Sequence, residues 1–248
     1  MSEYGPSTYG DRIAGVYDAY LPSNISATTE VAVEFLSAIA GGGRALELGI
    51  GTGRIGVPLA RRGVKVHGID ASEPMIERLR AKEGGADIPV VIGDFAAVDV
   101  AGQFDLIYVV FNTFFALLDQ DAQVRCFGNV AAHLTPGGVF VIEAFVPDPT
   151  MFDRGQRVGA VRVETDRVQL DASRLDPVTQ VVTSQHILIG AEGIVLLPVQ
   201  LRYAWPSELD LMARMARLSL RERFGGWQRE PFVATSPSHV SVYARGGG

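Results

Sequence analysis

Residues 47–56 read ELGIGTGRIG, a glycine-rich stretch that can be divided in two ways. From Gly51 it is G-x-G-x-x-G, and from Glu47 it is E-x-G-x-G-x-G. The apolar run RALEL before it predicts a strand, and GRIGVPLARRG after it predicts a helix that ends at Gly63. Glycines at such a turn let a ligand approach the backbone closely. The stretch therefore predicts a loop that holds a nucleotide-type cofactor.

Short apolar runs alternate with amphipathic segments on both sides of this loop, from about residue 27 to residue 146. The apolar runs predict strands, and they read RALELGI, VKVHGID, IPVVIGD, FDLIYVV and GVFVIEAF. The segments between them have helical spacing, and in SEPMIERLRAKE the residue Ser72 stands where a helix N-cap belongs. Buried strands that alternate with helices predict an α/β fold with a mostly parallel sheet covered on both faces.

After Pro147 the pattern becomes rich in strands. Three apolar stretches, RVGAVRVETDRVQLDAS, TQVVTSQHILIG and GIVLLPVQLRYAW, are separated by turn signals and by no helix, so we expect antiparallel pairing. A helix, PSELDLMARMARL, and two closing strands, SLRERFGGW and HVSVYAR, complete the chain. We therefore expect an N-terminal arm at 1–26, a core formed by 27–147 and 206–248, and an inserted antiparallel sheet at 148–205.

The composition argues against several classes of function. The 248 residues carry a net charge of −6, and the longest basic run is Arg61-Arg62, so the sequence predicts neither a nucleic-acid surface nor an anionic-membrane surface. The single cysteine, Cys126, cannot form an intrachain disulfide, and its helical context predicts an inert buried thiol. We find no signal-peptide pattern and no apolar run long enough to span a bilayer, and we expect a cytoplasmic protein.

The choice of cofactor depends on residues outside the glycine loop. Asp70 ends VHGID, and an acid there binds ribose hydroxyls of either a dinucleotide or a methyl donor, so it does not decide. Glu47 stands inside a buried strand, where a carboxylate is costly unless it is paired and where dinucleotide folds usually carry an apolar residue. Three further motifs follow in order, namely Gly93-Asp94-Phe95, LTPGG at 134–138 as a turn before the fifth strand, and the final SHVSVYAR.

Taken together at these spacings, the motifs resemble those of the class I, Rossmann-like S-adenosylmethionine-dependent methyltransferases. The resemblance covers roughly residues 30 to 145 and the two closing strands, and it implies a seven-stranded sheet whose last strand is antiparallel. It also implies S-adenosyl-L-methionine as cofactor and S-adenosyl-L-homocysteine as product. In that family the residues matching Gly49 and Gly51 line the methionine part, those matching Asp70 and Met75 hold the ribose and pack on the adenine, and those matching Asp94 and Phe95 read the adenine edge. The expected cofactor-binding set is completed by Tyr17, Glu47, Ala71 and Phe111.

The arm and the residues after Pro147 point to a narrower resemblance. STYGDRIAGVYDAYLP places Tyr9, Tyr17 and Tyr20 before the core, and Tyr9 and Tyr17 would share a face of one continuous helix if Gly10 did not interrupt it. This tyrosine arm, the aromatic FNTFFALL stretch and the appended sheet resemble small-molecule N-methyltransferases of antibiotic pathways. These include the lincosamide N-methyltransferases and the amino-sugar N,N-dimethyltransferases. The resemblance implies an arm that closes over the donor and an amine as methyl acceptor.

The expected acceptor site lies beyond the carboxyl ends of the strands. There we expect Tyr9, Tyr17 and Phe115 to shape the pocket. Glu143, near the end of strand five, can hold or deprotonate an ammonium, or it can be a structural hydrogen-bond acceptor. His186, the only histidine of the inserted sheet, can be a base or a substrate ligand. The donor is already activated, so we expect positioning to dominate catalysis.

Several alternatives remain open at this stage. The four histidines are scattered, so no metal site is predicted. An O- or carboxyl-methyltransferase uses the same donor motifs, an NAD-dependent oxidoreductase is a remote alternative, and a donor-binding regulator without turnover would also keep the loop. An exposed sheet leaves edges to protect, so we expect the inserted sheet either to cover the acceptor pocket or to pair with another subunit in a homo-oligomer.

Overall fold

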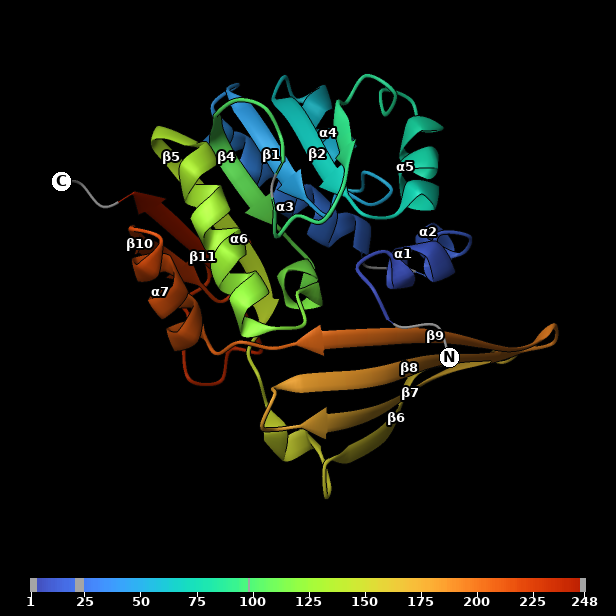
Figure 1. Cartoon of the computed structure of the whole chain (residues 1–248). Coiled ribbons are helices and arrows are strands. Elements are labelled where there is room, and N and C mark those ends of the chain that lie inside the picture. Colours follow the sequence, from blue (N-terminus) through green and yellow to red (C-terminus); the bar gives the residue numbers. More distant parts are fainter. Residues whose placement is uncertain (1–3, 21–24, 98, 246–248) are drawn as a thin grey trace.

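The computed structural model describes residues 4–20, 25–97 and 99–245 and contains two separate sheets (Figure 1). The larger sheet has seven strands in the order β10-β11-β5-β4-β1-β2-β3. The neighbours from β5 to β3 run parallel, and β11 runs antiparallel to both β5 and β10. This arrangement confirms the expected α/β fold. The strands are β1 (Arg44–Leu48), β2 (Lys65–Asp70), β3 (Val90–Ile92), β4 (Phe104–Val109), β5 (Leu134–Phe145), β10 (Leu218–Phe224) and β11 (Ser238–Arg245).

Helices cover both faces of this sheet. One buried apolar cluster packs α6 and α7 against β4 and β5, and a second packs α3 and α4 against the opposite face. Glycine and capping residues set the helix limits: α3 stops at Gly41, whose φ is 55°, and α6 starts where the Asp119 carboxylate accepts a hydrogen bond from Ala122 N at 2.7 Å. The helices are α3 (Ile25–Ala40), α4 (Gly56–Arg61), α5 (Glu73–Arg80), α6 (Gln120–His133) and α7 (Pro206–Met215).

Two local expectations are corrected by the structure. Ser72 has the extended backbone of an N-cap, but its hydroxyl donates to Asp11 Oδ1 at 2.7 Å instead of capping α5. The stretch LTPGG is part of β5 rather than a turn before it: Phe104 pairs with Leu134 and Leu106 pairs with Val139, so the extra residues form an irregularity in the register. The hydrogen bond from Ser72 to Asp11 joins the core to the arm. The irregularity at LTPGG leaves the rest of β5 paired in parallel with β4.

The smaller sheet is an antiparallel meander of β6 (Gln156–Val163), β7 (Arg167–Asp176), β8 (Val181–Gly190) and β9 (Gly193–Arg202). It lies beyond the carboxyl ends of the parallel strands, with β9 nearest to the core (Figure 1). Its last residue, Arg202, is almost fully buried and fastens the sheet to two core helices. The guanidinium donates to Gln123 Oε1 of α6 at 2.5 Å and to Glu208 Oε1 of α7 at 2.8 Å.

The arm consists of two short helices, α1 (Thr8–Ile13) and α2 (Tyr17–Tyr20), that rest between the core and β9 (Figure 1). The continuous helix considered from the sequence is broken after Ile13. Gly10 lies inside α1 and has a different role from a break: a Cβ there would be 2.5 Å from Ser72 Cβ, so glycine permits close contact with α5. Residues 21–24 and the side chain of Tyr20 lie outside the described part of the chain.

Two further observations concern the composition. Cys126 is fully buried in α6, and burial raises the pKa of its thiol. Among the residues that the structure describes, none of the helices combines the length and the apolar character required to cross a bilayer.

Candidate functional site

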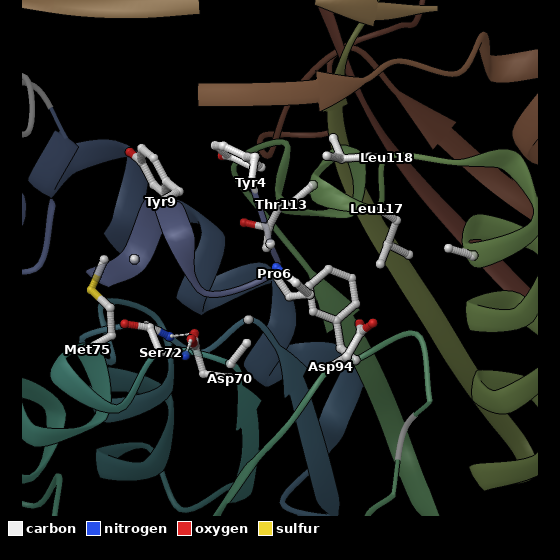
Figure 2. A pocket seen from close by; sticks show the side chains of 18 of the residues that line it. Tyr4, Pro6, Tyr9, Asp70, Ser72, Met75, Asp94, Thr113, Leu117 and Leu118 are labelled. Carbon is white, nitrogen blue, oxygen red and sulfur yellow. Dashed lines mark hydrogen bonds between the residues drawn. The ribbon is translucent and has the colours of Figure 1, made fainter. Parts of the chain in front are cut away.

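A cavity of about 330 Å³ opens where the parallel strands end, between the core, the arm and the start of α6 (Figure 2). This is the place where open α/β sheets bind ligands. The core contributes the glycine loop and the residues that follow β2 and β3. The arm contributes Tyr4, Gly5, Pro6, Tyr9, Gly10 and Tyr17.

The glycine loop presents open backbone to the cavity. Gly49 and Gly51 both have positive φ, of 73° and 54°, which only glycine adopts readily. At Gly51 an added Cβ would meet no protein atom within 4 Å, so space for a ligand exists directly over this backbone. A Cβ at Gly49, in contrast, would be 2.5 Å from the Thr113 side chain. Both glycines are therefore required, one for ligand approach and one for packing.

Asp70 is fixed beside this loop by backbone groups. One carboxylate oxygen accepts from Gly51 N at 2.7 Å and the other from Ser72 N at 2.9 Å. Each oxygen keeps a second lone pair, which suits a pair of ribose hydroxyls. Burial raises the pKa of this carboxyl group, while the two backbone N–H groups favour its charged form.

The rest of the cavity extends to both sides of Asp70, with Met75 on one side and Asp94 on the other (Figure 2). Met75 and Phe95 are buried and line it together with Ala71, and Asp94 Oδ1 accepts from Ala96 N at 2.8 Å. On the side of Asp94, a flat apolar group with a polar edge, such as adenine, would match Phe95 and the carboxylate. Residues that sequence reasoning missed complete the lining, namely Leu117, Leu118, Asp119, Ala122 and Arg125.

Arg54, inside the glycine loop, was also missed by the sequence analysis. Its Nε and Nη1 atoms are shielded from solvent and have no hydrogen-bond partner within the described part of the chain. The guanidinium lies over the Phe111 ring at 2.9 Å and beside Tyr17, and burial lowers its pKa. Unsatisfied buried donors on a cation are costly. Arg54 is not among the residues that line the cavity, but it lies beside Tyr17, which does, so an anionic group at that edge of the cavity would suit these donors.

Of the residues singled out from the sequence, the cavity brings together Tyr9, Tyr17, Gly49, Gly51, Asp70, Ala71, Met75, Asp94 and Phe95. It does not include Glu47, Phe111, Phe115, Glu143 or His186. Each of these five has another environment, which is described in turn.

Glu47 supports the loop from beneath. It is almost fully buried, and its Oε2 accepts from the Tyr108 hydroxyl at 3.0 Å. Burial raises its pKa to about 8, so the carboxyl group is mostly protonated at neutral pH. A Cβ on Gly56 would be 2.9 Å from Glu47 Oε2. The residue is thus a buried partner that joins β1, β4 and α4 rather than a wall of the cavity.

Glu143 and Phe111 act together to shape the loop after β4. Phe111 and Asn112 have φ values of 56° and 63°, which is unfavourable for residues with side chains. Glu143 Oε2 accepts from Phe111 N at 2.9 Å, and Asn112 Oδ1 accepts from Phe145 N at 2.7 Å, so the next strand holds this conformation. Glu143 is therefore a structural hydrogen-bond acceptor for the backbone, which is one of the two roles expected from the sequence. Its loop places Thr113, another residue missed from the sequence, in the cavity.

Phe115 belongs to the core and not to the acceptor pocket. Residues Thr113–Ala116 form a 3-10 helix, in which residues three apart share a side. Thr113 and Ala116 therefore face the cavity together, while Phe115 is fully buried and packs edge-on against Phe145 at 5.0 Å between ring centroids. Helical phase within this short turn explains why Phe115 is absent from the cavity lining.

His186 lies on β8 of the smaller sheet, where its Nδ1 contacts Asp171 Oδ1 at 2.5 Å. Asp171 was not singled out from the sequence, because only the register between β7 and β8 brings it opposite the histidine. Within the ranges that the structure describes, no cluster of histidine, cysteine, aspartate and glutamate has the arrangement of a metal site.

Comparisons with known proteins agree with this geometry. Residues 45–138 match the family described as "Methyltransferase domain". The chain is 30% identical over 203 residues to the cypemycin N-terminal methyltransferase of Streptomyces sp, which covers 81% of this chain and 82% of that protein. It is 32% identical over 151 residues to a dTDP-4-amino-2,3,4,6-tetradeoxy-D-glucose N,N-dimethyltransferase of Saccharopolyspora spinosa, covering 60% and 59% of the two chains.

Among solved structures, the CcbJ methyltransferase of Streptomyces caelestis superimposes with a TM-score of 0.91 at 40% identity, over 98% of this chain and all of that one. The agreement extends through the arm and the smaller sheet because nearly the whole chain is covered. These relatives confirm the cofactor that the loop motifs indicated, S-adenosylmethionine, and the prediction of a methyltransferase. The chain belongs to the S-adenosylmethionine-dependent methyltransferases, and its relatives include N-methyltransferases of antibiotic pathways.

Proposed function

We propose that this protein transfers a methyl group from S-adenosylmethionine to an amine nitrogen of a small molecule of the antibiotic or amino-sugar type. The observation that carries the proposal is the cavity itself. It extends from the open backbone at Gly51 to the arm tyrosines Tyr9 and Tyr17. The matched relatives named as an N-terminal methyltransferase and an N,N-dimethyltransferase support nitrogen as the acceptor.

The donor would be held along the core wall. We assign its ribose to Asp70, its adenine to Phe95 and Asp94, and its carboxylate to the edge of the cavity at Tyr17, where Arg54 lies. When bound, the donor supplies a methyl group on a positively charged sulfur, which leaves as a neutral thioether. Arg54 would gain charge-assisted hydrogen bonds for two donors that are otherwise unsatisfied, and such bonds are stronger than neutral ones.

The acceptor would be held along the arm wall. Tyr9 and Tyr17 present aromatic rings beside the cavity, and aromatic faces attract cationic amines. Burial raises the pKa of Tyr17, so its hydroxyl stays neutral at physiological pH. Methyl transfer to a well-oriented amine gains most of its rate from positioning. These side chains would therefore act mainly by orienting the nitrogen and excluding water.

An O- or carboxyl-methyltransferase is the competing assignment, and a turnover screen decides between the two. The wild-type protein is incubated with the donor and glucosamine, pyrrolidine, benzylamine, a peptide with a free amino terminus, glucose or octanoate, and each product is read by mass. We expect methylation of at least one amine and of neither glucose nor octanoate. Methylation of glucose or octanoate alone would overturn the assignment to nitrogen, and turnover of no compound would overturn the proposal for this acceptor class.

We also propose that the smaller sheet contacts a second copy of the chain through its outer face. Val158, Ile194 and Leu196 are exposed, and the strand register places them on one face. That face is opposite to Leu197, which is buried beneath the arm. Exposed apolar patches of this kind mark interaction sites. Light scattering on wild type and Leu196→Glu tests this, with a smaller particle expected for the variant and an unchanged monomer contradicting it.

A further inference from the structure

Tyr4, the first residue that the structure describes, lines the cavity although it precedes the helices of the arm. A tight turn between Tyr4 and α1 sets its position. In this turn Gly5 N donates to Thr8 Oγ1 at 2.8 Å, and Thr8 N donates to Gly5 O at 3.0 Å. Tyr4 is therefore held by an ordered turn at the entrance to α1.

The hydroxyl group of Tyr4 is attached to the smaller sheet. β9 is the last strand of that sheet, so the N–H groups on the side away from β8 are not used by the ladder. Residues two apart direct their N–H groups to the same edge, and on this edge Pro198 has none to offer. Gln200 N donates to Tyr4 Oη at 3.2 Å. None of the described residues of the sheet lines the cavity, so the sheet acts on the cavity through Tyr4.

Tyr4 is separated from the groups assigned to the donor. In Figure 2, Tyr4, Thr113 and Leu118 lie on one side of the cavity. Asp70 and Asp94, which we assign to the ribose and the adenine, lie on the other side. β9 also packs against the 3-10 helix that contains Thr113. The ring of Tyr4 thus stands between β9 and the space that remains for the acceptor.

The ring is anchored at both ends. Its Cα belongs to the turn before α1, and its hydroxyl accepts the hydrogen bond from Gln200 N. Tyr4 is half-buried, and burial raises the pKa of its hydroxyl, so the side chain is neutral at physiological pH. An aromatic side chain has only two rotatable bonds, and fixing both ends makes it a rigid wall. A wall of this kind can discriminate between ligands that differ by a single methylene, by about 10–200-fold.

We propose that Tyr4 determines the size of the amine that the cavity accepts, and that Gln200 N positions its ring. The proposal rests on the proposed function, because it concerns the acceptor of the methyl group. An amine that extends toward β9 meets the ring of Tyr4 before its nitrogen reaches the donor methyl group. A smaller amine fits below the ring. Removal of the ring therefore opens the cavity toward β9 and admits larger amines.

The test compares Tyr4→Ala and Tyr4→Phe with Val16→Ala, a matched control at an exposed arm residue that does not line the cavity. Two substrates are used, the amine of the screen that is methylated fastest and its analogue with one phenyl ring added at a carbon not bonded to the nitrogen. The readout is the ratio of kcat/KM for the larger amine to kcat/KM for the smaller one. We expect Tyr4→Ala to raise this ratio by about 10-fold or more, the low end for discrimination by size.

Tyr4→Phe should raise the ratio by a smaller factor, because the ring remains and only its hydrogen bond to β9 is lost. The control should match wild type, and all variants should bind S-adenosylhomocysteine within a few-fold of wild type by calorimetry. A rise in activity toward the larger amine is not expected from a variant that merely folds poorly.

An unchanged ratio in Tyr4→Ala would overturn the role of Tyr4 while leaving the amine assignment intact. A wild-type ratio in Tyr4→Phe would overturn the positioning role of Gln200 N. If wild type methylates no amine of the screen, the proposed function fails and the role of Tyr4 fails with it.

Discussion

In the core wall of the cavity, the groups that meet the ligand are positioned by backbone: Asp70 is tied to Gly51 N and Ser72 N, and Gly51 itself presents bare main chain. In the arm wall, the groups are side chains on two short helices. These helices are held by the buried side chain of Ile13, which packs with Met75 and Leu197, and by two polar contacts to the core, Ser72 to Asp11 at 2.7 Å and Lys82 Nζ to Asp18 at 2.9 Å. The ion pair joins side chains that are 35% and 43% exposed.

This difference in construction suggests a difference in task. Backbone-positioned groups in a buried sheet cannot move far, which suits a cofactor that is the same in every turnover. Exposed ion pairs contribute about 0–1 kcal/mol, so the cost of opening the arm comes mainly from the apolar packing of Ile13, which a bound ligand can strengthen. The core wall, which holds the donor, is therefore rigid, and the arm wall, which holds the acceptor, can change its shape. The predictions below test this contrast in order of decreasing effect.

The largest expected effect is on the free energy of unfolding and comes from Phe115, which belongs to the core and not to the arm wall. Because Phe115 is fully buried, Phe115→Ala should lower the free energy of unfolding by about 3–5 kcal/mol. Tyr9→Ala, in the arm, should lower it far less. Denaturant unfolding measures both. Equal stability of the two variants would contradict the placement of Phe115 in the core.

Glycine substitutions separate strain from ligand exclusion. Gly51 and Gly63 both have positive φ and open space at the Cβ position, but only Gly51 lines the cavity. Valine at either site should cost about 1–3 kcal/mol of stability through backbone strain. Only Gly51→Val should also weaken binding of S-adenosylhomocysteine, by on the order of 10²-fold or more. Similar binding losses in both variants would show that strain alone is responsible.

Glu47 allows a pH test of the fixed wall. Its pKa is raised from 4.5 to about 8 in the folded chain, so between these values folding takes up a proton. The stability contribution is therefore present below pH 4.5 and is lost as pH rises toward 8, by up to about 1.4 kcal/mol per pH unit. Glu47→Gln should remove this part of the pH dependence. Thermal unfolding from pH 5 to pH 8 measures it, and parallel curves for wild type and variant would refute the raised pKa.

The arm contacts should give the smallest change in binding energy. Asp18 accepts from Thr52 and pairs with Lys82, and Asp18→Asn weakens both contacts. We expect loss of about 0–1 kcal/mol in cofactor affinity but clearly faster proteolytic cleavage within the arm. Bound S-adenosylhomocysteine should slow cleavage in wild type more than in Asp18→Asn. If bound S-adenosylhomocysteine does not change the cleavage rate of wild type, the arm does not close over the ligand.

The contrast between the walls also explains what could be predicted from sequence. The fold and the loop motifs depend on local patterns, since apolar periodicity marks strands and glycines mark turns. Thr113 and Phe115 depend on the left-handed backbone at Phe111 and Asn112, which neither residue type favours. Asp171 depends on register between two strands. Arg54 was visible in the loop, but its burial depends on how Tyr17 folds back over it.

The most direct test of the two-wall account is a sequential calorimetric titration, first with S-adenosylhomocysteine and then with the amine found in the screen. Asp70→Ala should lose about 1.5–3 kcal/mol of binding energy for S-adenosylhomocysteine, the value typical for hydrogen bonds to a charged group. Tyr9→Ala should bind S-adenosylhomocysteine within a few-fold of wild type and then fail to bind the amine with wild-type affinity. If Tyr9→Ala instead loses S-adenosylhomocysteine as strongly as Asp70→Ala, or binds the amine normally, the division into a fixed donor wall and an adjustable acceptor wall is wrong.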